Sequence, residues 1–231
     1  MTTSKRIPEL RAGDVLTRPE FERRYAAMPH VKKAELVEGV VHMPSPVRYT
    51  QHGNPHFLLS QWLGHYVSAT PGVQGATDAT LRLDQDNEMQ PDLLLRIEGG
   101  RGRSHVDADG YVQGPPELIV EVAASSVSYD LHHKLRVYRR NGVGEYLVLR
   151  TEDAALDWFV LRGGAYERLA ADALGVVCSE VFPGLWLDTL ALLRGDAAAL
   201  RASVERGIAD PAHARFCASV ASDGAGRPRE P

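Results

Sequence analysis

The sequence predicts one α/β domain with a short helical appendage near its C-terminal end. Three observations lead to this prediction. Strand-like and helix-like patterns alternate along the 231 residues. Apolar residues make up 44% of the chain and charged residues 24%, a balance typical of a globular protein that can bury a sizeable core. The sequence shows no internal repeat and no strong linker that would divide it.

The first predicted elements are a helix and a hairpin. Residues 16–29, LTRPEFERRYAAMP, predict a short helix in which Thr17 is the N-cap, Pro19 lies in the first turn and Glu20 completes a capping box. In residues 34–46, AELVEGVVHMPSP, two apolar arms flank Glu38 and Gly39, and this pattern indicates a β-hairpin.

A longer helix, two strand segments and a loop come next. Residues 49–70 predict a helix with an inward stripe of Phe57, Leu58, Trp62, Tyr66 and Val67. Residues 72–84 and 91–97 read as strands. Residues 98–116 are polar and rich in glycine, so they predict a long loop, of a kind that is usually functional or mobile.

The second half of the chain begins with an apolar strand over residues 117–123. Residues 128–142 predict a helix that ends at Gly142 with basic residues in its last turn. Strands are then expected in GEYLVLR, ALDWFVLRGG and AYERLA, with a hairpin at Gly163 and Gly164. Residues 190–208 predict a helical stretch.

The resulting division of the chain has four parts. We expect a flexible N-terminus at residues 1–14, the main domain at 15–190, a helical appendage at 191–220 and a disordered tail at 221–231.

Charge and composition exclude several classes of protein. The net charge of −4 provides no global basic field for nucleic acid, although a local patch can act alone. The two cysteines, Cys178 and Cys217, form no pairing or zinc motif. The N-terminus has no apolar signal region, and no apolar run approaches the roughly 20 residues that span a bilayer. We therefore expect a cytoplasmic protein with no membrane association.

Each of two apolar strands carries an acidic residue that is out of place, Asp92 at the start of PDLLLRI and Glu121 in the middle of ELIVEVA. Burying a carboxylate without a partner is costly, so both acids need compensation. If the strands are neighbours, a divalent cation with oxygen ligands would allow both acids to ionise. Lys134, on the next helix, borders that helix's inward stripe and could position water or a phosphate.

Each acid and the lysine also have an ordinary structural interpretation. Asp92 could belong to a turn, Glu121 could form a salt bridge with an arginine, and Lys134 could pair with Asp130 at i,i+4 spacing. The order strand acid, strand acid, helix lysine is more informative than any of its parts.

With these motifs the chain resembles the Uma-two putative restriction endonucleases, a bacterial branch of the PD-(D/E)XK nuclease superfamily. The resemblance extends from the Thr17 helix to FPGLWLD. It depends on ELVEGVVHMPSP, His52 at the start of a helix, QPDLLL, PPELIVEVAASS, and Asp130, Lys134 and Tyr138 followed by GVGEYLVL. It implies a restriction-endonuclease-like fold, a mixed β-sheet core flanked by helices with the active site at the edge of the sheet.

The resemblance also assigns roles to residues. Asp92, Glu121 and the main-chain carbonyl of Val122 would hold Mg²⁺, for which Mn²⁺ could substitute, and Lys134 would be the catalytic lysine. The standard motif has this lysine two residues after the second acid, where this chain has Ala123. The implied auxiliary residues are Glu38, as an outer metal position, with His52 and Tyr138.

The implied activity is metal-dependent endonucleolytic hydrolysis of DNA, expected to be double-stranded, with 5′-phosphate and 3′-hydroxyl products. Two alternatives stay open. One is a catalytically degenerate module that keeps the nuclease fold and binds nucleic acid or protein, which Ala123 and the negative net charge favour. The other is a metal-dependent hydrolase of a different substrate. A homodimer is also left open.

Two further groups of residues bear on function. His52 and His56 have helical metal-ligand spacing but lack the glutamate of a zinc-hydrolase motif. Six arginines are expected near the site, where they would either hold a phosphate backbone or form a solvated surface. They are Arg96, Arg101, Arg103, Arg136, Arg139 and Arg140.

Overall fold

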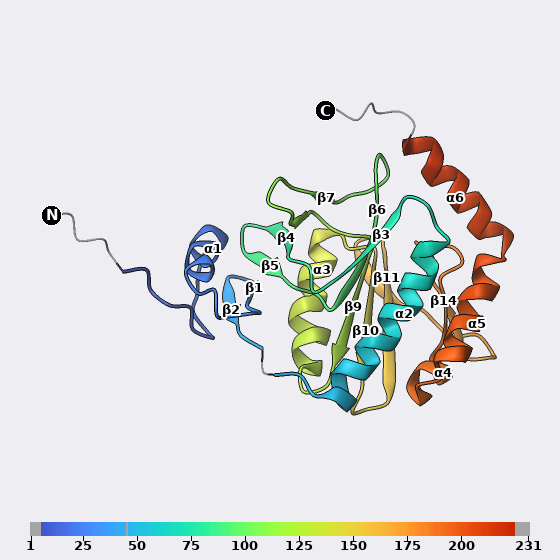
Figure 1. The fold of residues 1–231 in the computed structure, drawn as a ribbon, viewed down its shortest axis with the longest axis horizontal. Helices are drawn as coiled ribbons and strands as arrows, with labels where there is room; N and C mark the ends of the chain where they lie inside the picture. Colours follow the sequence, from blue (N-terminus) through green and yellow to red (C-terminus); the bar gives the residue numbers. More distant parts are fainter. Residues whose placement is uncertain (1–5, 45, 225–231) are drawn as a thin grey trace.

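A mixed β-sheet forms the centre of the protein (Figure 1). The computed structural model describes residues 6–44 and 46–224, and six strands of this sheet lie within those ranges. In sheet order they are β12 (Ala165–Arg168), β11 (Ala155–Arg162), β10 (Glu145–Arg150), β9 (Leu118–Ala123), β6 (Leu93–Ile97) and β3 (Val73–Thr77). Strands β9 and β10 are parallel, whereas the other neighbours are antiparallel. The predicted α/β class with a mixed sheet is confirmed.

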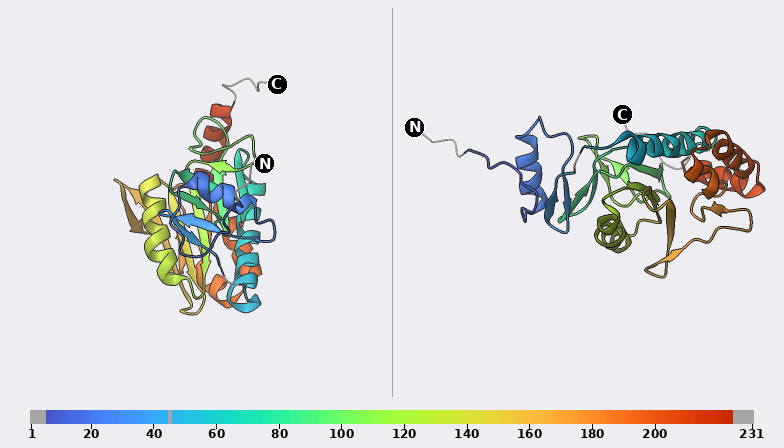
Figure 2. Two further views of the ribbon diagram at one scale, coloured as in Figure 1. Left: turned by 90° about the vertical axis from the view of Figure 1, so that its left-hand side faces the viewer. Right: turned by 90° about the horizontal axis from the view of Figure 1, so that it is seen from below.

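Two helices cover the opposite faces of this sheet (Figure 2). Helix α2 (Asn54–Ser68) packs on the face to which Val120 and Val122 contribute, and helix α3 (Leu135–Asn141) packs on the face that carries Ile119 and Ala123. Every residue of β9 is buried. The strand is therefore central, as its apolar sequence predicts, and any polar side chain on it needs a partner inside the protein.

A second sheet lies beside the first, toward the N-terminal part of the chain (Figure 1). Its order within the described residues is β2 (Val40–His42), β1 (Glu35–Val37), β5 (Asn87–Met89), β4 (Leu81–Asp84), β8 (Val112–Gln113) and β7 (His105–Val106). The hairpin predicted at Glu38 and Gly39 is confirmed, since both residues have positive φ, 52° and 76°, as a two-residue turn of type I′ requires. The segment predicted as a loop contains strands β7 and β8. These strands were not predicted, because two residues are too few to produce a sequence pattern.

Helix α1 (Arg18–Ala26) begins where the sequence predicts, directly after Thr17. The Thr17 side chain makes no capping hydrogen bond, and Glu20 instead accepts hydrogen bonds from Arg23 and Arg24. Before this helix, Leu10 is buried in a small core with Phe21, so this part of the segment expected to be flexible is packed.

The inward stripe of α2 agrees with the predicted one at Trp62 and Tyr66, which are buried, and at Leu58 and Val67, which pack against the core, but not at Phe57. Phe57 is 58% exposed, whereas Leu59, Trp62, Leu63 and Tyr66 are buried. The helix is apolar on more than one face, so periodicity alone cannot select the face that packs on the sheet.

The C-terminal region contains three helices among the described residues, α4 (Thr189–Arg194), α5 (Ala197–Ile208) and α6 (Pro211–Gly224). Gly195, with a φ of 71°, ends α4, so the helical stretch predicted at 190–208 is two helices. Helices α4 and α5 contribute Leu192, Leu200 and Val204 to the same core as α2. Strands β13 (Val176–Cys178) and β14 (Trp186–Asp188) precede them and were not predicted.

Helix α6 includes the first residues of the expected tail, and the remainder, 225–231, lies outside the described residues, as do residues 1–5. No helix in the described part of the chain is both long and apolar enough to span a membrane.

Candidate active site

The register between β6 and β9 brings the two strand acids together. Leu93 pairs with Val120 in this antiparallel ladder, so the next position places Asp92 opposite Glu121. Side chains that lie opposite each other in such a pair have Cβ atoms about 5 Å apart. Asp92 is 4% exposed and Glu121 3% exposed. Two buried carboxyl groups therefore lie close together, Asp92 directly before the first residue of β6 and Glu121 within the central strand β9.

The Val122 peptide group faces Asp92. Its N–H donates a hydrogen bond of 2.8 Å to Asp92 Oδ2. The carbonyl groups of Glu117 and Ala123 accept hydrogen bonds from the amides of Glu145 and Thr151. The main-chain groups of the odd-numbered residues of β9 therefore point toward β10, and those of the even-numbered residues point toward β6. Because the N–H and C=O of one strand residue point the same way, the Val122 carbonyl also faces the Asp92 side.

Lys134 reaches Glu121 from a short π-helix, η2 (Tyr129–Lys134), which leads directly into α3. The Lys134 Nζ lies 2.8 Å from Glu121 Oε1, 3.2 Å from Glu35 Oε1 and 3.7 Å from Asp130 Oδ1. The pair with Asp130 predicted from i,i+4 spacing therefore exists, but the shortest contact is with Glu121. Wide π-helical turns occur mostly at functional sites.

Ala123 explains why a lysine from the helix can occupy this space. Its side chain shares the sheet face of Glu121 and is fully buried under α3. A methyl group at this position leaves room for the Lys134 side chain to reach Glu121. Tyr138, one turn further along the helix, donates a hydrogen bond of 3.0 Å to the same Glu121 oxygen.

Asp92 has its own set of partners. His52 Nε2 lies 3.2 Å from Asp92 Oδ2, and Lys33 Nζ lies 3.5 Å from Asp92 Oδ1. His56 Nε2 lies 3.0 Å from the Asp92 main-chain carbonyl oxygen. His52 belongs to a second short π-helix, η1 (Tyr49–Gly53), at the start of α2. Both histidines are therefore occupied with Asp92, which argues against the zinc-type pair considered from their spacing.

Lys33, Glu35 and His56 contact the site residues but were not among the expected site residues. Glu35 is 3% exposed within the apolar strand β1, and it also accepts a hydrogen bond of 2.9 Å from Gln90 N. A buried acid in an apolar strand is the signal that identified Glu121, so the same reasoning could have identified Glu35. Lys33 carries no comparable signal, because its role depends on the tertiary position of Asp92.

Six charged side chains, here called the site cluster, share this region. They are Glu35, Asp92, Glu121, Asp130, Lys33 and Lys134. Four carboxyl groups and two ammonium groups would leave a net charge of −2 if all were ionised. Such an excess of buried negative charge favours either proton uptake or a bound cation.

The pKa values in the cluster follow this imbalance. Burial raises the pKa of Glu121 to about 8, with Lys134 opposing the shift and Asp92 adding to it. Burial alone would also raise the pKa of Asp92, but the His52 hydrogen bond and the Lys33 charge outweigh it and hold that pKa well below its usual range. Burial would lower the pKa of Lys134, yet the surrounding carboxylates raise it, so Lys134 stays charged.

Glu38 lies apart from the other expected site residues. It occupies the turn of the β1–β2 hairpin, is about one third exposed, and pairs with Arg136 at 2.9 Å, His133 at 3.3 Å and Arg140 at 3.6 Å. These contacts connect the hairpin to α3.

The donor set is compatible with a magnesium ion. No group of three or more His, Cys, Asp and Glu side chains suited to a metal occurs among the residues described. Mg²⁺, however, is commonly held by one or two carboxylates plus water and phosphate oxygens, and Asp92 and Glu121 provide two. The Tyr129 hydroxyl, beside Lys134, is buried without a hydrogen-bond partner and could serve a coordinated water or a phosphate oxygen.

The six arginines expected near the site do not form one patch. Arg96 lies four residues along β6 from Asp92, about 13 Å away. Arg101 donates to Ser219 of α6, and Arg103 donates to the Gly142 carbonyl at the far end of α3. Arg139 donates to the Gly164 carbonyl. Arg136 and Arg140 pair with Glu38, so the site is not surrounded by uncompensated arginines.

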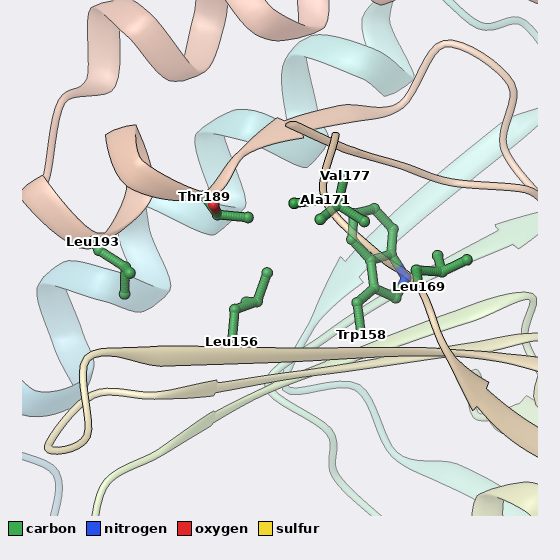
Figure 3. A pocket seen from close by; sticks show the side chains of 7 residues that line it. All are labelled: Leu156, Trp158, Leu169, Ala171, Val177, Thr189 and Leu193. Carbon is green, nitrogen blue, oxygen red and sulfur yellow. The ribbon is translucent and has the colours of Figure 1, made fainter. Parts of the chain in front are cut away.

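A cavity of about 190 Å³ between β11 and α4 is not part of the site. Figure 3 shows its lining, in which Leu156 and Trp158 extend from β11 while Thr189 and Leu193 face them from α4. The lining has no acidic or basic side chain, so this cavity offers no group for acid–base or metal chemistry.

Comparisons with known proteins bear on the family and on the fold. A family model, Uma2, described as putative restriction endonuclease, matches residues 18–191. No curated protein matches the chain. A crystal structure of a putative nuclease belonging to DUF820 from Anabaena variabilis ATCC 29413 is similar, with a TM-score of 0.57 and 14% sequence identity over 75% of this chain and 97% of that chain. The predicted fold, a mixed sheet flanked by helices, is thereby confirmed.

Proposed function

The chain belongs to the Uma2 family of putative restriction endonucleases, and from this premise we propose that it is a metal-dependent endonuclease that hydrolyses phosphodiester bonds of double-stranded DNA. The family itself implies nuclease activity on nucleic acid. One observation carries the finer proposal: Asp92 accepts a hydrogen bond of 2.8 Å from the amide of Val122, the residue after Glu121, and Lys134 Nζ lies 2.8 Å from Glu121.

Asp92 and Glu121, together with the Val122 carbonyl, would hold Mg²⁺ or Mn²⁺. A bound divalent cation polarises the scissile phosphate and lowers the pKa of a coordinated water. The excess negative charge of the site cluster favours such an ion, because a charge of +2 offsets it without proton uptake.

Protein side chains would orient the attacking water and hold the two metal-binding carboxylates in place. Lys134 is charged and buried, so its ammonium group can orient the attacking water or stabilise the charge that develops on the phosphate. Tyr138 holds the Glu121 carboxyl group in place through its hydroxyl. His52 and Lys33 keep Asp92 ionised and ready to act as a ligand.

The alternative, a degenerate nuclease fold that binds without cleaving, loses its main support in this geometry. It was favoured by Ala123 at the position where the standard motif has lysine. Lys134 contacts Glu121 from η2, and this contact supports the proposal that a lysine from a different part of the chain takes the role of the missing one.

A plasmid nicking assay with Mg²⁺ or Mn²⁺ tests the proposal. Wild-type protein should nick supercoiled DNA, and Asp92→Asn or Glu121→Gln should lower the rate at least about 100-fold, since loss of a ligand costs more than loss of an outer partner. Glu145→Gln is the matched control, because Glu145 is a fully buried acid on the neighbouring strand β10 and lies outside the cluster.

Two results would contradict the proposal. If the wild-type protein leaves DNA intact with both metals while binding it in a salt-sensitive manner, the protein is a binding module. If Asp92→Asn nicks as fast as Glu145→Gln, the site has been placed wrongly.

A further inference from the structure

A polar cavity of about 350 Å³ lies at the opposite end of β6 and β9 from the site cluster. Its volume falls within the range of small-molecule sites. The lining consists of two arginines, a histidine, a serine and two glycines, namely Arg96, Arg103, His105, Ser104, Gly99 and Gly102. No acidic side chain is part of this lining, so the cavity has a positive character.

Arg96 is the central feature of this cavity. It is only 7% exposed, and its guanidinium group donates to Ser104 Oγ at 3.3 Å, to the Ser104 carbonyl oxygen at 2.9 Å and to Gln74 Oε1. All three acceptors are neutral. In the described part of the chain, no carboxylate forms an ion pair with Arg96. A buried guanidinium group without an anionic partner is costly, and buried charges in proteins are normally paired.

The nearest acid does not neutralise the cavity. Glu117 is buried, and its two carboxylate oxygens accept hydrogen bonds from Ile97 N at 2.7 Å and Arg103 N at 3.1 Å. The Arg103 side chain lies 3.7 Å from Glu117 but donates its hydrogen bond to the Gly142 carbonyl. Glu117 therefore satisfies main-chain amides of the loop and forms an ion pair with Arg103, but it forms none with Arg96, so the Arg96 guanidinium group is left without an anionic partner among the described residues.

The loop that forms the wall is held in one conformation. Gly102 donates a main-chain hydrogen bond of 3.0 Å to the Gly99 carbonyl. A Cβ atom on Gly102 would lie 2.0 Å from the Ile97 carbonyl oxygen, so only glycine fits this close approach. A preformed wall favours binding, because the loop does not have to be ordered when a ligand arrives.

From these observations we infer that the cavity is an anion site for a phosphate group, separate from the nuclease site and held chiefly by Arg96. Guanidinium groups match phosphate oxygens in a planar, two-pronged geometry, and His105 at the exposed rim adds a third donor. The phosphate would belong either to a free nucleotide or to a nucleic-acid backbone, since both present the same group.

Calorimetric titration with inorganic phosphate at constant ionic strength, with chloride as the balancing anion, tests this site. Wild-type protein should bind one phosphate, and Arg96→Gln should weaken binding at least about tenfold, the loss expected for one charge-assisted contact. Arg201→Gln is the matched control, an exposed arginine on α5 paired with Glu205, and it should bind as wild type does. Asp92→Asn should also bind normally, which separates this site from the nuclease site.

A second variant covers the case in which Arg96→Gln fails to fold. His105→Glu places a carboxylate at the rim without removing any Arg96 hydrogen bond, and it should abolish phosphate binding. The inference is wrong if wild type does not bind phosphate, or if His105→Glu binds as tightly as Arg201→Gln.

Two additional ligands identify the source of the phosphate. Deoxyadenosine monophosphate should bind and deoxyadenosine should not; equal binding of the two would contradict a phosphate site. A DNA duplex without terminal phosphates that displaces phosphate from the wild type, and that binds Arg96→Gln more weakly than the wild type, assigns the site to the nucleic-acid backbone. A duplex that does not compete assigns it to a free nucleotide.

Discussion

Replacing Glu121 with glutamine should lower the cleavage rate at least about 100-fold and yet make the protein more stable than the wild type as the pH rises from 5 to 7. Glutamine has nearly the same shape as glutamate, and its carbonyl oxygen can still accept the hydrogen bonds from Lys134 and Tyr138. What it removes is a buried carboxyl group whose pKa is raised to about 8 by burial. The same substitution therefore separates the contribution of Glu121 to catalysis from its cost to folding.

The magnitude follows from the difference in proton binding between the folded and unfolded states. An unfolded glutamate releases its proton near pH 4.3, whereas folded Glu121 keeps it until about pH 8. Between these values the folded state binds more protons, so the stability of the wild type falls as pH rises, by at most about 1.4 kcal/mol per pH unit. Over the two pH units from 5 to 7 this slope gives at most about 3 kcal/mol, so we expect the wild type to lose about 1–3 kcal/mol more than Glu121→Gln in that range.

Urea unfolding of both proteins in metal-free buffer across this pH range measures the difference. Parallel stability curves for the two proteins would show that Glu121 is ionised in the folded state throughout, and the reasoning would then be refuted. Adding Mg²⁺ at ten times its dissociation constant should stabilise the wild type by about 1.4 kcal/mol and leave Glu121→Gln nearly unchanged.

Three further predictions concern neighbouring groups. Lys134→Met should abolish nicking and lower the unfolding free energy at pH 7.5 by about 3–5 kcal/mol, because it leaves buried carboxylates unpaired. This loss of stability, measured by urea titration, should be smaller at pH 5. An equal loss at both pH values would contradict the prediction. Asp92 contributes stability that is present above its unfolded pKa and is lost as the pH falls through its lower folded pKa. Because Lys33 helps to lower that folded pKa, Lys33→Gln should shift the midpoint of acid unfolding, followed by circular dichroism, to higher pH. An unchanged midpoint would show that Lys33 does not stabilise the Asp92 carboxylate. Glu145 accepts hydrogen bonds from Ser179, Trp158, Glu180 N and Val181 N. Glu145→Gln should therefore lower the free energy of unfolding by about 1–3 kcal/mol, measured by thermal or urea unfolding, while nicking is retained. Loss of nicking in the folded variant would contradict the placement of Glu145 outside the site.

Much of the fold could be predicted from local patterns. The apolar run around Glu121 indicates a central strand because side chains alternate between two buried faces, and the structure buries all of β9. The two residues Glu38 and Gly39 predict a hairpin because a tight turn requires positive φ. The face of α2 could not be chosen in this way, since Phe57 and Leu59 are equally apolar and only packing against the sheet distinguishes them.

The site could be predicted only in part. Asp92 and Glu121 were identifiable because a carboxylate in an apolar strand needs a partner. Lys134 was expected because it borders the inward stripe of the next helix and because the family resemblance points to it, whereas Lys33 carried no signal. Both π-helices, η1 with His52 and η2 with Lys134, also escaped prediction, because a single widened turn leaves no recognisable periodicity.

By itself, the sequence determined which segments form the central strands and which of their side chains share a face of the sheet, since these properties follow from residues that are neighbours in the chain. Tertiary structure alone decided which buried charges meet. The contact of Lys134 with Glu121 depends on how α3 packs over Ala123, and the neutral surroundings of Arg96 depend on how the loop at Gly102 folds against β6. Electrostatic energy varies with the distance between groups on different elements, and packing sets that distance.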